Sequence, residues 1–148
     1  MTIVVAVDGS PDSYAAIRLA HEEAGLRKVA LVAVMAYRSA DGVLGTPAAR
    51  PLSTPRSPGE DQTLTESTLR SAVRAALGSD IDGVELRAVA EPPGRALVDI
   101  ARAADAMMVV LSARKEGTPS RLLGAVSQYV LRNAPCPVLV VPETSKAR

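Results

Sequence analysis

The sequence predicts an α/β fold with a doubly wound parallel sheet of five strands and helices on both faces. Five short apolar runs rich in β-branched residues recur along the 148 residues, and amphipathic stretches of helical period lie between them. Most of the runs are continuously apolar, as in strands that are buried on both faces. Strand and helix alternate throughout, which favours right-handed crossovers and a doubly wound sheet.

The predicted strands differ in how deeply they are buried. They cover residues 3–7, 29–35, 84–89, 106–111 and 138–141. In the third, Val84, Leu86 and Ala88 alternate with Glu85 and Arg87. This alternation predicts an edge strand with one face in water.

Four helices are predicted between or after these strands. The first starts at Ser10-Pro11-Asp12, where Ser10 supplies a capping hydroxyl and Pro11 takes the first helical position, and it ends at Gly25. Gly78 ends the second helix and Pro135 ends the fourth. The apolar faces of the last three helices are Leu69, Ala72, Val73, Ala76 and Leu77; Leu97, Ile100, Ala101 and Ala104; and Leu123, Val126, Val130 and Ala134.

One segment, residues 38–59, breaks this pattern. It holds four prolines and three glycines, too many for a regular helix or strand. It follows the second strand and therefore leaves from the carboxyl edge of the sheet, where ligands bind in open α/β sheets. We interpret it as a long loop, either a mobile excursion or an ordered lid, within one domain of residues 1–148.

Composition excludes several classes of function. Lys and Arg total 17 against 16 Asp and Glu, so the net charge of +1 offers no basic field to nucleic acid or to a membrane surface. Aromatic residues make up 2%, too few for stacking platforms. No apolar run approaches transmembrane length, and the first residues do not resemble a signal peptide. We expect a cytoplasmic protein without nucleic-acid or membrane partners.

Few residues are available for catalysis or metal binding. His21 is the only histidine, and we expect it to be solvated on the first helix. Cys136 is the only cysteine; it fits a reducing compartment, and its place between prolines favours inert packing. Neither a metal cluster nor a nucleophile–base set can be assembled, so we predict no metal site and no enzymatic activity.

Two places at the predicted carboxyl edge could bind a ligand. Asp8 ends the first strand, and its carboxylate could accept hydrogen bonds from a ribose or a base, or could serve a cap and tight turn. Residues 111–127 lead into the fourth helix, whose N-terminal N–H groups and dipole suit a phosphate. Within this segment, Gly117 and Gly124 would let the backbone approach a ligand closely.

The last strand is short, apolar and bracketed by Pro137 and Pro142. As the last strand and a predicted sheet edge, it favours pairing with a second copy of the chain. The alternative is a strand covered by its own chain. The predicted dimer interface consists of Val138, Leu139, Val140 and Val141.

Together these features resemble the universal stress protein family, over nearly the whole chain. The resemblance rests on residues 5–10, on Ala104-Asp105-Ala106 and, most specifically, on residues 124–142. It implies a sheet of order 3-2-1-4-5 and homodimers that are often joined through the last strand. It also implies that ATP, in members that bind it, lies at the carboxyl edge of the sheet.

The phosphate loop of those ATP-binding members is altered here. Their loop reads G-x-x-G, nine further residues, and then G-S or G-T. In this chain Leu111 and Arg114 stand at the first two glycine positions, Gly124 is retained, and Ala125 replaces the hydroxyl residue. A side chain at 111 or 114 would intrude on the phosphate, and a positive φ there would cost about 1–2 kcal/mol. Losing the hydroxyl at 125 costs about 1 kcal/mol.

The half of the site that would bind base and ribose is retained. The resemblance places Asp8 at a nucleotide-contacting position and Val34 beside the adenine, with Ala6 near it. Gly124 and Ser127 match positions on the phosphate side. An adenosine-like ligand with few phosphates would therefore suit this site better than ATP.

These features leave two main hypotheses. The first is a dimeric stress-response or regulatory protein with a degenerate nucleotide site and no tight ATP binding. The alternative is a sensor of ATP, AMP or cyclic AMP that uses Asp8, Val34, Gly124 and the positive charges of Arg114 and Lys115. In the first, Arg114 could itself occupy the phosphate position. A phosphoacceptor signalling domain would need paired carboxylates after the first strand, where Asp8 stands alone.

Overall fold

The computed structural model describes residues 1–38, 58–78, 81–113 and 124–142. Its five strands form one parallel sheet in the order β3-β2-β1-β4-β5, which confirms the predicted fold class and strand order. The strands are β1 (Thr2–Ala6), β2 (Ala30–Ala36), β3 (Val84–Val89), β4 (Ala106–Ser112) and β5 (Val138–Val141). The helices are η1 (Pro11–Ser13), α1 (Tyr14–Arg27), α2 (Pro58–Leu77), α3 (Pro93–Ala103) and α4 (Ala125–Asn133).

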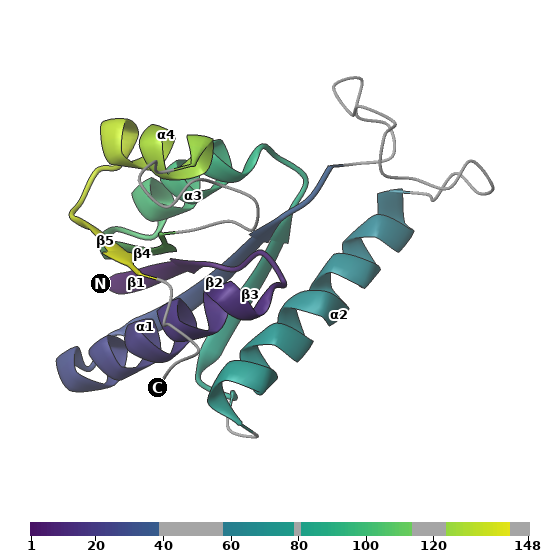
Figure 1. Ribbon diagram of the computed structural model, residues 1–148, viewed down its shortest axis with the longest axis horizontal. Helices are drawn as coiled ribbons and strands as arrows, with labels where there is room; N and C mark the ends of the chain where they lie inside the picture. The colour runs from purple at the N-terminus through teal and green to yellow at the C-terminus, as the bar shows by residue number, and fades with distance from the viewer. Residues whose placement is uncertain (39–57, 79–80, 114–123, 143–148) are drawn as a thin grey trace.

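The sheet is the middle of three layers (Figure 1). Helices α1 and α2 cover one face, and α3 and α4 cover the other. Successive residues of β1 serve the two faces in turn: Ile3 and Val5 pack toward α1 and α2, whereas Val4 packs toward α3 and α4. This explains why the sequence of β1 is apolar without alternation.

The start of α1 differs from the prediction. The Ser10 hydroxyl does not cap the helix; it donates to Asp8 Oδ1 at 2.7 Å, and residues 11–13 form the 3-10 turn η1 before α1 begins. Gly25 does not end the helix either. The chain leaves α1 at Lys28, which adopts a left-handed conformation (φ 56°) while the N–H of Val29 bonds to the carbonyl of Ala24 at 3.0 Å. This hydrogen bond closes the helix end. Lys28 takes the left-handed position that glycine usually occupies there.

Helix α2 begins earlier than the sequence suggested. Pro58 and Gly59, assigned above to an irregular segment, form its first two residues. Proline is tolerated at the first helical position, and Glu60 and Asp61 in the first turn complement the helix dipole. The rest of that segment, residues 39–57, lies outside the described residues.

Strand β3 lies at one edge of the sheet, and two of its outward backbone groups are hydrogen-bonded to described residues. The position confirms the edge predicted from its alternation, with Glu85 and Arg87 exposed. At its start the N–H of Val84 donates to Ile81 O at 3.0 Å, and near its end Gln62 Nε2 of α2 donates to Ala88 O at 3.1 Å. The carbonyl of Val84, both backbone groups of Leu86 and the N–H of Ala88 also point outward, and no described residue bonds to them.

Strand β5 lies at the other edge, and its outward backbone groups are open. The carbonyls of Pro137 and Val141 accept from the N–H groups of Val109 (3.0 Å) and Ala113 (2.7 Å) and so face β4. The N–H and C=O groups of Val138 and Val140 therefore point away from β4. Among the described residues none bonds to them. Also within the described residues, no helix is long and apolar enough to cross a membrane.

Candidate functional site at the carboxyl edge

A cavity of about 1000 Å³ lies at the carboxyl edge of the sheet. It is bounded by the ends of β1, β2 and β4 and by the first residues of α3 and α4. The cavity brings together six of the predicted site residues: Ala6, Asp8, Val34, Gly124, Ala125 and Ser127. Arg114, Lys115 and Gly117, which were also predicted, lie outside the described residues.

Asp8 both forms a turn and lines the cavity. Its Oδ1 accepts hydrogen bonds from the N–H (2.8 Å) and the hydroxyl (2.7 Å) of Ser10. Gly9 between them has φ +85°, a conformation that side chains rarely adopt. Oδ2 accepts no bond from the described residues. The two interpretations of Asp8 left open by the sequence are therefore compatible: one oxygen holds the turn and the other is available to a ligand.

One side of the cavity is apolar. Ala6 and Val34 from the sheet face Pro93 and Leu97 at the start of α3. The sequence placed Leu97 on the apolar face of the third helix, but neither Leu97 nor Pro93 was predicted as a site residue. Topology could have indicated them, because α3 starts just after β3 and its first turn must lie at the same edge as the end of β1.

The other side of the cavity is the N-terminus of α4. Gly124 is the N-cap residue and provides no side-chain cap. The first intrahelical bond joins the N–H of Gln128 to Gly124 O at 3.0 Å, so the N–H groups of residues 125–127 have no acceptor within the helix. Ser127 is 7% exposed and lines the cavity, and its hydroxyl makes no hydrogen bond with the described residues. These donors and the helix dipole together suit an anion.

Leu111 does not strain the backbone, because the condition for the expected penalty, a positive φ at this position, is not met. It lies inside β4, is 2% exposed and packs in the core beneath α3 and α4. Among the described non-glycine residues, only Lys28 and Asp105 have positive φ. The penalty of a positive φ therefore does not apply at 111, because the strand continues to Ser112. The Leu111 side chain does line the cavity.

The remaining reactive side chains lie away from this cavity. His21 is exposed on α1, as expected. Cys136 is half-buried against the core beneath α3 and α4, and this burial raises the pKa of its thiol, which agrees with inert packing. Within the described residues, no group of three or more His, Cys, Asp or Glu could hold a metal ion.

Comparisons with known proteins agree on one family. Residues 1–142 match the family model described as the universal stress protein family. Two universal stress proteins of Mycobacterium tuberculosis are each 31% identical to the chain over 147 residues. The match covers 94% of this chain and 46% of theirs, so the chain spans about half the length of these curated relatives.

Solved structures of similar fold include nucleotide complexes. A universal stress protein in complex with cAMP is 27% identical, with a TM-score of 0.65 and coverage of 97% of this chain and 98% of that one. A universal stress protein from Archaeoglobus fulgidus in complex with dAMP is 25% identical, with a TM-score of 0.65 and coverage of 95% and 97%. UspA from Lactobacillus plantarum, 24% identical with a TM-score of 0.71 and coverage of 95% and 97%, supports the fold.

Proposed function

Because the chain belongs to the universal stress protein family, as its match over residues 1–142 shows, we propose that it binds an adenine nucleotide with a single phosphate and binds ATP only weakly. The cavity at the carboxyl edge is the proposed site. In this proposal the protein acts as a regulatory sensor through binding and through protein contacts, without catalysis.

The observation that carries this proposal is the division of the cavity into two ends. At one end, Val34 and Leu97 offer an apolar surface to a base, and Asp8 presents a carboxylate oxygen. A carboxylate is an acceptor matched to the hydroxyl donors of a ribose. At the other end, the open N-terminus of α4 and the Ser127 hydroxyl offer donors to a phosphate.

The polarity of the phosphate end favours one phosphate over three. None of the described residues that line the cavity carries a positive charge, and Asp8 carries a negative one. Ala125 contributes a methyl group where ATP-binding members have a hydroxyl. Among the described lining residues, a triphosphate would find only neutral donors for its several negative charges. The cAMP and dAMP complexes of similar proteins each contain a single phosphate group, which supports the same choice.

Titration calorimetry of the purified, nucleotide-stripped protein tests the proposal. We expect AMP or cyclic AMP to bind in the micromolar range and ATP to bind about tenfold or more weakly. ATP binding as tight as that of AMP would contradict the proposed preference for one phosphate. An absence of heat and of thermal shift with all three nucleotides at millimolar concentration would refute nucleotide binding and leave a protein that acts through protein contacts alone.

We also propose that the protein forms a homodimer through β5. The open backbone groups of Val138 and Val140 at this edge support the proposal. The side chain of Val140 is half-buried and belongs to neither core, so a second copy would cover apolar surface there.

Val140→Lys should convert the dimer into a monomer, because pairing would bury an unpaired charge while the isolated fold leaves this side chain partly in water. Size-exclusion chromatography with light scattering measures the change. Leu131→Lys is the matched control, since Leu131 is an exposed residue of α4 outside the strand. A dimer that persists in Val140→Lys, or a monomeric wild type, would rule out this interface.

A further inference from the structure

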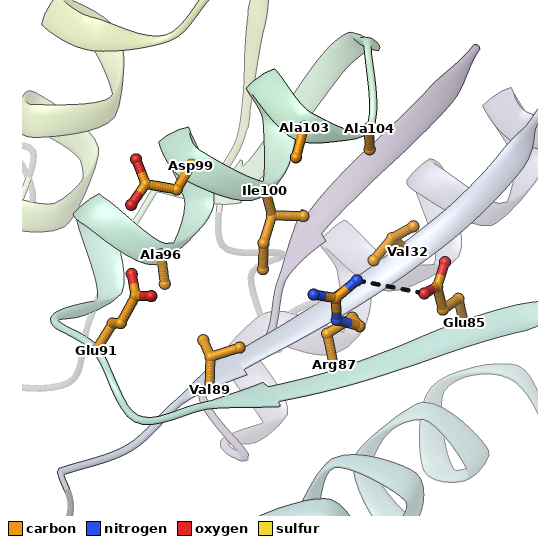
Figure 2. Close-up of a pocket in the computed structure, with 10 residues that line it drawn as sticks. All are labelled: Val32, Glu85, Arg87, Val89, Glu91, Ala96, Asp99, Ile100, Ala103 and Ala104. Carbon is orange, nitrogen blue, oxygen red and sulfur yellow. Dashed lines mark hydrogen bonds and ion pairs between the residues drawn. The ribbon is translucent and has the colours of Figure 1, made fainter.

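A second cavity, of about 300 Å³, lies on the face of the sheet covered by α3 and opens beside the edge strand β3 (Figure 2). The cavity exists because α3 packs over β1, β2 and β4 and leaves uncovered the side chains that β3 presents on this face of the sheet. We call this cavity the β3–α3 groove. Its residues come from β2, β3, the turn after β3 and the adjacent side of α3.

The floor of the β3–α3 groove is apolar. Val32 of β2 is 3% exposed and Ile100 of α3 is 8% exposed, and both face the groove together with Ala96 and Val89. Figure 2 shows Ile100 pointing from α3 toward Val89, with the groove opening between helix and strand. Val32, Ala96 and Ile100 are already nearly out of water, so an occupant with an apolar stem would mainly cover the half-buried Val89.

The rim of the groove is negatively charged. Glu85, Glu91 and Asp99 line it, against a single arginine, Arg87, so three carboxylates and one guanidinium leave two negative charges. Arg87 Nη1 already pairs with Glu85 Oε1 at 3.5 Å (Figure 2). The side chains of Arg87 and Glu85 are 49% and 56% exposed, so this pair is weak, and the excess of carboxylates lies on the side of α3 and the preceding turn.

Neither of the other two carboxylates is firmly neutralised. Asp99 Oδ2 lies 3.8 Å from Arg95 Nε, but the side chains of Arg95 and Asp99 are 70% and 51% exposed, so this pair is weak. Glu91 makes no hydrogen bond or ion pair with the described residues. Both acids line the same groove, above an apolar floor.

We propose that the β3–α3 groove docks an arginine side chain carried by an extended segment of a partner protein. The aliphatic stem of arginine would pack on Val89 beside Ile100, as long cationic side chains do on apolar surface. Its planar guanidinium would pair with carboxylate at the rim, where Glu91 and Asp99 offer acceptors. Arginine is among the residues enriched at protein–protein interfaces, which also suits this chemistry.

The groove is separate from the nucleotide cavity, and the proposal does not depend on nucleotide binding. Val32 lines the groove and Val34, two residues further along the same face of β2, lines the cavity. On α3, likewise, Ala96 lines the groove and its neighbour Leu97 lines the cavity. The two sites therefore share a wall without sharing a lining residue.

A pair of peptides that differ in one charge tests the proposal. The probe is the capped tripeptide glycyl-arginyl-glycine, and its control carries citrulline, a neutral isostere, in place of arginine. In ¹H–¹⁵N correlation spectra of the full chain, the arginine peptide should shift the amide signals of residues 85–91 and 96–104. The citrulline peptide should bind about tenfold more weakly. Equal shifts with both peptides would overturn the proposal.

A matched pair of variants locates the binding. Glu91→Gln should weaken the arginine peptide about threefold to fivefold, and Glu22→Gln, the same change on the exposed surface of α1, should leave its affinity unchanged. Equal losses in both variants would mean that the peptide follows overall charge, which would refute a built site. Shifts of the same groove signals on raising the concentration of the protein alone would identify a second copy as the occupant and would also refute the proposal.

Discussion

Asp8→Asn is expected to weaken the binding of AMP about tenfold to a hundredfold, because it removes a charge-assisted hydrogen bond of about 1.5–3 kcal/mol. Asparagine retains an oxygen that can accept from the N–H and the hydroxyl of Ser10, so the turn at Gly9 is preserved. The loss should therefore arise from the oxygen that faces the cavity. Titration calorimetry measures the affinity, and circular dichroism during thermal unfolding verifies that the fold persists.

Asp12→Asn is the control for that measurement. Asp12 lies four residues further along, in η1, and does not line the cavity. Its substitution changes the net charge by the same amount and should leave the affinity for AMP unchanged. Asp8→Ala, which also removes the turn acceptor, should abolish binding while the dimer remains. Full affinity for AMP in both Asp8 variants would show that the nucleotide does not use this carboxylate.

Gly94→Ala is expected to destabilise the fold by about 1–3 kcal/mol through overpacking. Gly94 is the second residue of α3, and a Cβ built there would lie 2.8 Å from Cδ1 and 3.1 Å from Cβ of Tyr129 on α4. Those atoms are close to the backbone of α4, so Tyr129 cannot avoid the contact by moving only the end of its side chain. Chemical denaturation measures the loss in the free energy of unfolding.

The structure provides a matched control and a rescue for this prediction. Gly59 is likewise the second residue of its helix, after Pro58, and a Cβ there meets nothing within 4 Å. Gly59→Ala should be neutral or stabilising by up to about 1 kcal/mol, as expected from helix propensity. In a Tyr129→Ala background, Gly94→Ala should lose its penalty, which a double-mutant cycle detects. An unchanged penalty in that background would place its cause outside the contact between α3 and α4.

The fold could be predicted well from the sequence because burial leaves a strong periodic signal. The continuous apolar run of β1 and the alternation of Glu85 and Arg87 with apolar neighbours in β3 indicate a central strand and an edge strand respectively. Helix ends were less predictable. Lys28 takes the left-handed position that Gly25 was expected to provide, because hydrogen bonds around it satisfy the helix end in spite of its side chain.

The candidate site could be predicted in part. Asp8 and Gly124 were identified from their places at a strand end and a helix start, and Val34 from the family resemblance; the structure brings all three to one cavity. The lining that α3 contributes to the cavity through Pro93 and Leu97 depends on tertiary packing, so no local sequence pattern predicts it. The β3–α3 groove escaped the sequence analysis for the same reason, since it depends on which part of the sheet α3 leaves uncovered.

The difference between the two sheet edges limits how large an assembly can grow by strand pairing. A chain with two open edges could add copies at both ends and polymerise into a fibre with a continuous sheet. Here Gln62 and Ile81 occupy one backbone group near each end of the β3 edge, while no described residue bonds to the outward groups of β5. Two copies joined by isologous pairing of β5 would consume both β5 edges and present at either end a β3 edge that Gln62 and Ile81 partly cover. Such an assembly is closed by symmetry, so its size would stay the same at any concentration above that needed to form it.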